Sequence, residues 1–325
     1  MAGTKVFAAK LKNKAELLKS TSGGAFVALS EDFVNEGNAV ACAKYDYESN
    51  NVVFTLVTNK AERDKARGTK YIQAQMGDIY AECVTWLKDH PGKKVMFFGL
   101  GCQTASFQQF ISMKRMADRI VTIDIICHGA PSPRIWKEYI ECLTSHDRLQ
   151  SVNFRDKKTG WNRSVGTAVI NGREVSIQDF RRLYSSRNLT RPSCYFCPYT
   201  KIDRASDITI GDFWHIEKTM PDFVDQAGVS LIITHTDVGE LLFEQAKKYM
   251  DYRISNTTDC WQYNLEKPTE MPPTRAQFWK EHRTKGIRFV VQKYGQPSGR
   301  TQKIRKGLKL LLAKIGLVDQ YNGGL

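Results

Sequence analysis

Apolar and polar positions along the first 127 residues predict strands and helices in alternation. Strands are expected at 5–11, 38–46, 50–59, 95–99 and 119–127, and helices at 25–37, 76–92 and 104–117. The run 95–99 is apolar and ends in Gly, which suits a strand buried on both faces. Because a helix pattern separates it from the next strand, the two strands should be parallel and joined by a right-handed crossover.

The pattern changes after residue 150. Short strands are expected at 152–156, 161–170 and 173–180, with buried strands again at 206–214 and 228–236 and a helix at about 238–249. Asn171-Gly172 is typical of a type I′ hairpin turn, so the short strands should be antiparallel. Beyond residue 256 prolines interrupt the pattern until a basic helix closes the chain.

These elements predict an α/β fold: a mixed, largely parallel sheet with flanking helices, an antiparallel β insertion and a basic C-terminal helix. We expect three parts, an N-terminal α/β module at 1–92, a second module packed on it at 93–255, and a basic extension at 256–325. A chain of 325 residues with 42% hydrophobic residues has enough apolar surface for such a core.

Charge is concentrated at the C-terminal end. The chain carries a net charge of +14, and from Met271 onward twelve Lys and Arg residues face two acids, so this tail holds most of the excess. The residues before it are nearly neutral and need not bind polyanions. The N-terminal residues lack the apolar core of a signal peptide, and no run approaches the ~18 apolar residues of a membrane span. We therefore expect a cytoplasmic protein.

Four of the eight cysteines fall in loops where metal or redox chemistry is expected, since a reducing compartment disfavours disulfides. Cys102 follows the strand 95–99 and Cys127 ends the strand 119–127, so both should lie at the carboxyl edge of one sheet, where α/β proteins bind ligands. Cys194 and Cys197 form a C-x-x-C motif followed by Pro. Four thiolates from three loops are able to hold a cubane iron–sulfur cluster.

Spacing alone leaves other interpretations open. A C-x-x-C pair also serves as half of a structural zinc site, although zinc ribbons normally supply a second close pair. The thiols could equally be unliganded structural residues. The remaining cysteines lie in strand-like or helix-like segments and are expected to be ordinary buried residues: Cys42, Cys83, Cys142 and Cys260.

Six ordered motifs resemble the β-subunit family of coenzyme F420 hydrogenases and dehydrogenases, most closely its bacterial members associated with exopolysaccharide and capsule biosynthesis. They are SGGAF (22–26), RGTKYIQA (67–74), GLGCQ (99–103), DIICHGAPSP (124–133), FRDKKTGW (154–161) and CYFCPYTKIDRASDITIGDFW (194–214). The resemblance implies bound FAD in the module 1–92 and a [4Fe–4S] cluster in the module 93–255. Its cluster ligands map onto Cys102, Cys127, Cys194 and Cys197.

A flavin dinucleotide needs a site for its pyrophosphate. Ser22, Gly23 and Gly24 at an expected helix start offer free N–H groups and a favourable dipole, although Ser22 could simply cap the helix. The segment around Lys70, Tyr71 and Gln73 is a second candidate, in which Lys70 would face a phosphate or the electron-rich edge of the flavin. Exposed lysines are, however, usually only solvated.

Other polar residues near these motifs are candidates for substrate chemistry. His128 could exchange a proton near the cluster and flavin, or only orient its loop by a hydrogen bond. Asp212 could bind substrate or a flavin ribose, or cap a turn. The turn from Arg155 to Trp161 could reach a sugar or nucleotide, although it also has the composition of an ordinary β-turn.

The C-terminal segment 300–317 predicts a basic amphipathic helix. Such a helix suits peripheral contact with the inner face of an anionic membrane, and packing on its own protein is equally open. No nucleic-acid-binding motif accompanies the charge, so no nucleic acid is expected.

The sequence thus favours an FAD- and [4Fe–4S]-dependent oxidoreductase with Lys70 and His128 as catalytic candidates. Relatives often begin with a ferredoxin module that this chain lacks, so an external ferredoxin-like or other donor would supply electrons. The resemblance implies an organic acceptor, such as a sugar, nucleotide sugar or lipid-linked glycan in polysaccharide biosynthesis. Two alternatives are a deazaflavin-linked reductase or dehydrogenase subunit and a non-catalytic, zinc-bearing, membrane-associated scaffold.

Overall fold

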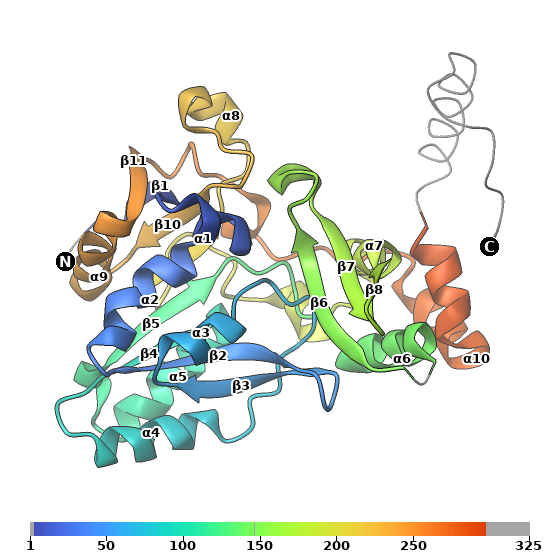
Figure 1. The fold of residues 1–325 in the computed structure, drawn as a ribbon, viewed down its shortest axis with the longest axis horizontal. Coiled ribbons are helices and arrows are strands. Elements are labelled where there is room, and N and C mark those ends of the chain that lie inside the picture. Colours follow the sequence, from blue (N-terminus) through green and yellow to red (C-terminus); the bar gives the residue numbers. More distant parts are fainter. Residues whose placement is uncertain (1–2, 146, 297–325) are drawn as a thin grey trace.

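The computed structural model describes residues 3–145 and 147–296 (Figure 1). The strands are β1 (Lys5–Leu11), β2 (Ala39–Asp46), β3 (Asn51–Val57), β4 (Val95–Leu100), β5 (Ile120–Ile125), β6 (Leu149–Asp156), β7 (Val165–Ile170), β8 (Arg173–Ser176), β9 (Ile208–Asp212), β10 (Ser230–Thr234) and β11 (Met250–Ser255). The α-helices are α1 (Lys14–Lys19), α2 (Ala25–Asn35), α3 (Lys60–Lys65), α4 (Ile79–Asp89), α5 (Gly101–Met113), α6 (Pro133–Thr144), α7 (Gln178–Ser185), α8 (Ile216–Thr219), α9 (Asp237–Ala246) and α10 (Arg275–Tyr294).

An eight-stranded mixed sheet forms the larger part of the protein, in the order β11-β1-β10-β9-β5-β4-β2-β3. The central strands β2, β4, β5 and β9 pair in parallel, and the strands on both sides of them pair antiparallel. The α/β fold with a parallel core is therefore confirmed. Strands from before and after residue 92 belong to this one sheet.

Helices cover both faces of the sheet. Val40 and Phe98 belong to a core that includes residues of α2 and α9, whereas their neighbours Ala41 and Phe97 pack with α4 and α5. Successive side chains of a strand point to opposite faces, so this alternation places the two helix pairs on opposite sides. The apolar run of β4 is buried on both faces by this double coverage.

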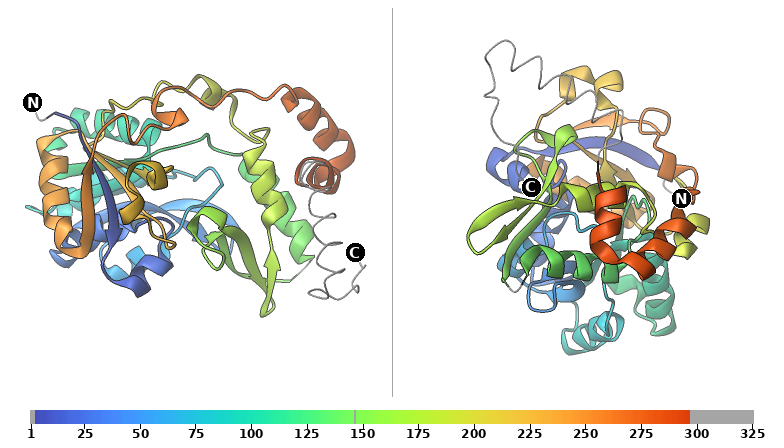
Figure 2. Two further views of the ribbon diagram at one scale, coloured as in Figure 1. Left: turned by 90° about the horizontal axis from the view of Figure 1, so that it is seen from above. Right: turned by 90° about the vertical axis from the view of Figure 1, so that its right-hand side faces the viewer.

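A smaller lobe contains the antiparallel sheet β6-β7-β8 with α6, α7 and α10, seen to one side of the main sheet in Figure 2. The predicted hairpin turn is confirmed, because Asn171 and Gly172 have φ values of 47° and 74°, as a type I′ turn requires. The core of this lobe is rich in aromatic side chains, among them Trp136, Phe154 and Phe180.

Several elements differ from the sequence prediction. The expected strand 173–180 ends at Ser176, and α7 follows, because Phe180 and Leu183 are buried with helical spacing. The helix expected from Thr104 begins at Gly101, which places Cys102 in its first turn. The helices α1, α3, α6, α8 and α10 and the strand β11 were not predicted. The apolar pattern of α10 is broken at Gly286, where φ is 78°.

Residues 256–274 connect β11 of the main sheet to α10 of the smaller lobe (Figure 2). Within the described ranges, no helix combines the length and apolar character needed to cross a bilayer. The basic amphipathic helix predicted at 300–317 lies outside the described residues.

Candidate functional site

A cavity of about 310 Å³ lies at the carboxyl ends of β4, β5 and β9. These strands are neighbours in the sheet, and Leu100 pairs with Ile125 in parallel register. The predicted convergence of the loops that follow them is therefore confirmed. Segments between β1 and α2 and between α3 and α4 form further walls, and Arg155 and Tyr184 contribute from the smaller lobe. A concave site at this edge is where α/β proteins bind ligands.

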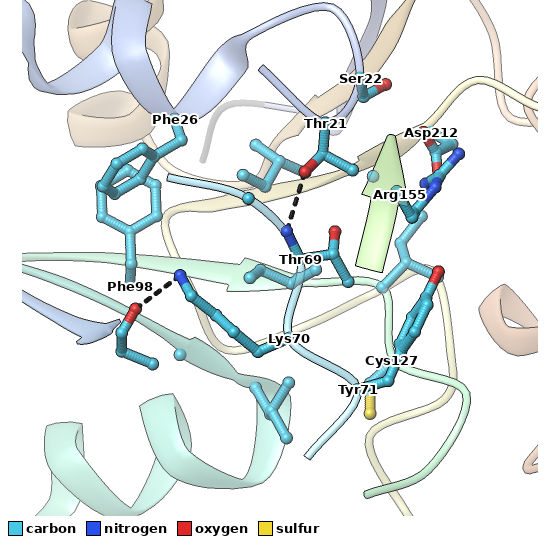
Figure 3. A pocket seen from close by; sticks show the side chains of 18 of the residues that line it. Thr21, Ser22, Phe26, Thr69, Lys70, Tyr71, Phe98, Cys127, Arg155 and Asp212 are labelled. Carbon is cyan, nitrogen blue, oxygen red and sulfur yellow. Dashed lines mark hydrogen bonds and ion pairs between the residues drawn. The ribbon is translucent and has the colours of Figure 1, made fainter. Parts of the chain in front are cut away.

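The two ends of the cavity differ in chemistry (Figure 3). At one end Phe26 and Phe98 pack edge to face with ring centroids 4.7 Å apart. At the other end lie Tyr71, Arg155 and Asp212. An apolar aromatic end beside a charged end suits a ligand with a flat ring system and polar substituents.

The segment Ser22–Gly24 lies beside the cavity at the start of α2. Ser22 Oγ donates to Val229 O at 2.9 Å, and no side chain caps α2, so Ser22 is not the helix cap. Gly24 has a φ of 86° and lines the cavity together with Ser22. Gly23 does not line it; a Cβ there would lie 2.2 Å from Ala9 O, so Gly23 permits close packing against β1.

The segment 66–74 forms the facing wall. Thr69 N donates to Thr21 Oγ1 at 2.8 Å, which ties the two walls together (Figure 3). Arg67 pairs through Nη2 with Glu16 at 2.6 Å, while Arg67 Nη1 is buried without a hydrogen-bond partner among the described residues. An unpartnered guanidinium N–H close to an uncapped helix start fits an anionic group such as the pyrophosphate of FAD.

Lys70 crosses the middle of the cavity (Figure 3). Its Nζ donates to Ala43 O at 2.9 Å and to Ala66 O. Burial lowers the pKa of Lys70 to about 8, against the opposing effect of Cys42. Two carbonyl partners leave one of its three N–H donors for a ligand.

Tyr71 lines the cavity and stacks on Tyr184 of α7, with ring centroids 4.2 Å apart and planes 17° apart. Burial raises the pKa of Tyr71, so its hydroxyl stays protonated. Gln73 is not among the lining residues; its backbone N–H donates to Pro131 O at 3.2 Å and so supports the loop after Cys127.

Asp212 at the end of β9 lines the cavity, and both carboxylate oxygens have protein partners. Oδ2 forms an ion pair with Arg155 Nη1, and Oδ1 accepts from Trp161 Nε1 at 2.7 Å. The pair is largely buried, with 5% and 13% of the side chains exposed. The structure thus brings Asp212 to the cavity but engages it with Arg155.

His128 follows Cys127 and lines the cavity. Its Nδ1 lies 2.5 Å from Asn264 Oδ1, and Thr269 Oγ1 donates to its carbonyl at 2.9 Å. Burial lowers the pKa of His128, which favours the neutral imidazole.

The four candidate cysteines come from three segments: the first turn of α5, the loop after β5, and residues 192–197. An added Cβ on Gly129 would lie 3.6 Å from Cys194 Cβ, so the loop after Cys127 packs on the C-x-x-C segment. Burial raises the pKa of the Cys102 and Cys127 thiols, and the neighbouring thiols among the four candidates add to this effect. Arg191 N donates a backbone hydrogen bond to Ala130 O at 2.9 Å. This bond holds the loop after Cys127 against the segment that leads to Cys194. Burial raises the pKa of Cys127 to about 12, so a metal is needed to keep this thiol deprotonated.

The four thiols do not form a closed metal site as they stand. Among the described residues, no group of three or more Cys, His, Asp or Glu side chains is close enough to hold a single metal ion. A tetrahedral zinc ion would need sulfur atoms only ~3.8 Å apart, from Zn–S bonds of about 2.3 Å. Four cysteines on three segments are a ligand set that serves a zinc ion and a [4Fe–4S] cluster alike, so the ligand set does not choose between them.

The other cysteines are more varied than expected. Cys83 and Cys260 are buried and Cys142 is partly buried. Cys42 is buried as well, but it lines the cavity beside Lys70. Burial raises its pKa to about 11, so it remains a neutral thiol.

Several lining residues were not singled out from the sequence. They are Phe26, Phe98, Tyr184, Trp214 and Gln262. Phe98 lies in an apolar strand whose sequence predicts only burial in the core. Gln262 lies beyond the six motifs. The local sequence therefore did not indicate that either residue lines a cavity. Trp214 ends a quoted motif. Arg155 belongs to the turn 155–161 that the sequence offers as a sugar- or nucleotide-binding segment, and the structure places Arg155 in the cavity wall.

Comparisons with known proteins agree with the fold. A sequence model of the coenzyme F420 hydrogenase/dehydrogenase family, describing the C terminus of the beta subunit, matches residues 92–259. A structure of the F420-reducing [NiFe] hydrogenase complex from Methanosarcina barkeri, studied by xenon derivatization, contains a similar chain. The TM-score is 0.50 at 18% identity, covering 89% of each chain, which shows a shared fold. No curated protein matches this chain.

Proposed function

Because the chain belongs to the family of coenzyme F420 hydrogenase/dehydrogenase beta subunits, we propose that it is an FAD- and [4Fe–4S]-dependent oxidoreductase. Cys102, Cys127, Cys194 and Cys197 hold the cluster, and the cavity holds the flavin. When bound, these groups supply electron and hydride chemistry that protein side chains lack. The overall reaction carries electrons from an external donor to an organic acceptor.

One observation carries this proposal: Cys127 belongs to both sites. Gly129 N donates to Cys127 Sγ at 3.3 Å, and an added Cβ on Gly129 would lie 3.6 Å from Cys194 Cβ, so the Cys127 loop packs on the C-x-x-C segment. Cys127 also lines the cavity. His128, the next residue, also lines the cavity. A redox group on these thiols and a flat ring in the cavity would therefore lie side by side, as electron transfer between them requires.

The surrounding side chains bind and orient the flavin. Ser22, Gly24 and Arg67 surround its pyrophosphate, and the free N–H of Lys70 donates to an electron-rich edge of the ring. Tyr71 lies at the charged end, where its protonated hydroxyl is a donor. The neutral imidazole of His128 offers a proton acceptor close to Cys127.

An external ferredoxin-like donor has access to the cysteines. Cys102 is exposed, and Phe196, between the two cysteines of the C-x-x-C motif, is 78% exposed. An exposed aromatic side chain next to a redox centre is suited to transient protein contact.

The acceptor is a sugar, nucleotide sugar or lipid-linked glycan, by analogy with the similar bacterial chains that accompany polysaccharide biosynthesis. A deazaflavin is the second candidate, supported by the family's description. A non-catalytic, zinc-bearing scaffold is the alternative of another class, since cysteines in a C-x-x-C motif also bind zinc. The family match favours the oxidoreductase over it.

Flavin content and reducibility test the proposal. The anaerobically purified chain should release about one FAD, and a reduced ferredoxin should bleach its flavin absorption. Cys197→Ser should keep the flavin yet bleach slowly with ferredoxin. Oxidation of the reduced protein by coenzyme F420, and not by sugar nucleotides, would favour the deazaflavin acceptor. A chain that takes up no flavin after reconstitution would exclude the proposed function.

A further inference from the structure

Three cations surround the charged end of the cavity, where the smaller lobe meets the main sheet. Arg155 comes from β6, Lys157 follows that strand, and Arg181 comes from α7. Two carboxylates act on Lys157, those of Asp212 and Asp225. Asp225 is itself occupied, since it pairs with Lys10 at 3.2 Å and Lys14 at 3.0 Å. Asp212 is thus the main anionic partner of the three cations at the charged end of the cavity.

Arg155 does not use all of its N–H donors within the protein. Nη1 pairs with Asp212, and Nε lies 3.5 Å from Ser164 Oγ, the upper limit for a hydrogen bond. Within residues 3–145 and 147–296, no hydrogen bond involves Nη2. The guanidinium lies 5.3 Å from the ring centre of Trp214, another residue of the cavity wall.

The neighbouring cations are held in place by neutral groups. Lys157 Nζ donates to the carbonyls of Leu17, Ser22 and Ala227, which satisfies its three N–H donors without neutralising its charge. Arg181 Nη1 donates to Ser164 O and to Gln178 Oε1 at 3.3 Å. Both residues therefore add positive charge next to Arg155.

The excess of positive charge is electrostatically costly. Burial and then the charge of Arg155 lower the pKa of Lys157 to about 8. Burial is also the largest cause of the lowered pKa of Arg181, and Arg155 contributes in the same direction. Buried cations that repel one another are stabilised by an anion brought among them.

We propose that Arg155, with Lys157 and Arg181 behind it, forms a site for a phosphoryl group of the ligand that occupies the cavity. The fork of an Arg side chain matches phosphate oxygens, and Nη2 is the donor available for it. This inference rests on the proposed function in taking the cavity as the ligand site. The phosphoryl group has two sources. One is the flavin pyrophosphate, since Ser22, placed beside it above, has its carbonyl 2.9 Å from Lys157 Nζ. The other is a phosphorylated acceptor.

Asp212 competes with that phosphoryl group for Arg155. Asp212→Asn keeps an oxygen for Trp161 Nε1 and removes the competing charge, so phosphate affinity should rise. Arg155→Gln should lower it. If the ion pair between Arg155 and Asp212 were purely structural, the result would differ. Removing either partner would then disturb the charged end of the cavity and weaken pyrophosphate binding in both variants.

The test is calorimetric titration of inorganic pyrophosphate into flavin-free and flavin-loaded protein. We expect binding to the wild type, at least tenfold weaker binding to Arg155→Gln, and several-fold tighter binding to Asp212→Asn. The exposed Arg173→Gln is the matched control and should bind as the wild type does. Loss of binding after flavin loading identifies the flavin as the source, and retained binding identifies the acceptor.

No binding to the wild type, unchanged binding to Arg155→Gln, or equal losses in both variants would overturn the inference. If Arg155→Gln fails to fold, the double variant with Asp212→Asn removes both buried charges together and should bind at least tenfold more weakly than the wild type. Crystals of the wild type soaked with tungstate give a test without variants: tungstate should lie at Arg155 Nη2. A protein that binds flavin and iron but not pyrophosphate would reject this inference alone. A protein that binds pyrophosphate at Arg155 but takes up neither flavin nor iron would reject the proposed function alone.

Discussion

Asn264 Oδ1 faces His128 Nδ1 at 2.5 Å across 136 positions of the sequence. The orientation of the amide follows from its other contacts, since Asn264 Nδ2 donates to Lys267 O at 3.4 Å and to Thr269 Oγ1 at 3.2 Å. Oδ1 therefore accepts from His128, and the imidazole carries its proton on Nδ1. Nε2 is left as an acceptor in a residue that lines the cavity.

Replacing Asn264 by Leu should remove the preference of His128 for the tautomer protonated on Nδ1. The buried Nδ1–H would lose its acceptor, at a cost of about 1–3 kcal/mol in the free energy of unfolding. Nitrogen NMR of labelled histidine should show the Nδ1–H form in the wild type and a mixture in Asn264→Leu. Asn35→Leu alters an exposed position of α2 and serves as a control for the labelling. An unchanged tautomer in Asn264→Leu would contradict this assignment.

Gly129 should be needed for the cysteine loops to meet. It has a φ of 102°, and an added Cβ would lie 2.5 Å from Thr190 Cγ2 and 3.6 Å from Cys194 Cβ. Gly129→Ala should therefore push the Cys127 loop from the Cys194 segment and reduce bound iron by more than half. Gly172→Ala is the matched control, because its φ is 74° but no atom lies within 4 Å. Equal iron contents in the two variants would argue against a role of loop packing in metal binding.

Lys70 should make stability depend on pH. Burial lowers its pKa in the folded protein to about 8, whereas in the unfolded chain it is about 10.4. Between these values the unfolded chain binds more protons, so the free energy of unfolding should rise with pH relative to Lys70→Met. The gain should stay below about 3 kcal/mol, because the side chain is partly exposed to the cavity.

Urea unfolding of flavin-free protein at pH 7.5 and at pH 10 measures this difference. Lys157 titrates in a similar range but is present in both proteins, so its effect cancels in the comparison. Parallel pH curves for the wild type and Lys70→Met would show that the Lys70 pKa is not lowered.

The cysteines should separate into ligands and non-ligands. Cys102→Ser, Cys127→Ser, Cys194→Ser and Cys197→Ser should each lose most of the bound iron and sulfide. Cys142→Ser is the matched control, since Cys142 is partly buried in α6, outside the cavity wall. Iron loss from Cys142→Ser equal to that from the four candidates would indicate general instability rather than ligation.

The sequence was informative where local pattern determines structure. The apolar runs of β4 and β5 and the helix pattern between them predicted parallel strands, and so the common edge that carries Cys102 and Cys127. The type I′ turn at Asn171-Gly172 followed from the preference of these residues for positive φ. Both predictions needed only neighbouring residues.

The remaining features depend on long-range contacts. Arg155 and Asp212 are 57 positions apart, and the cavity end that they form exists only where the smaller lobe meets the sheet. Nothing in the sequence around Gly23 indicates that this residue packs against β1. The helix α10 escaped prediction because its apolar positions follow no regular period across Gly286.

Quantitative metal and sulfide analysis of the anaerobically reconstituted chain tests the central claim, that the four converging thiols hold an iron–sulfur cluster. The account predicts about four iron and four sulfide per chain, with no stoichiometric zinc, and loss of both in Cys127→Ser. Stoichiometric zinc without sulfide, or iron retained in full by Cys127→Ser, would contradict it.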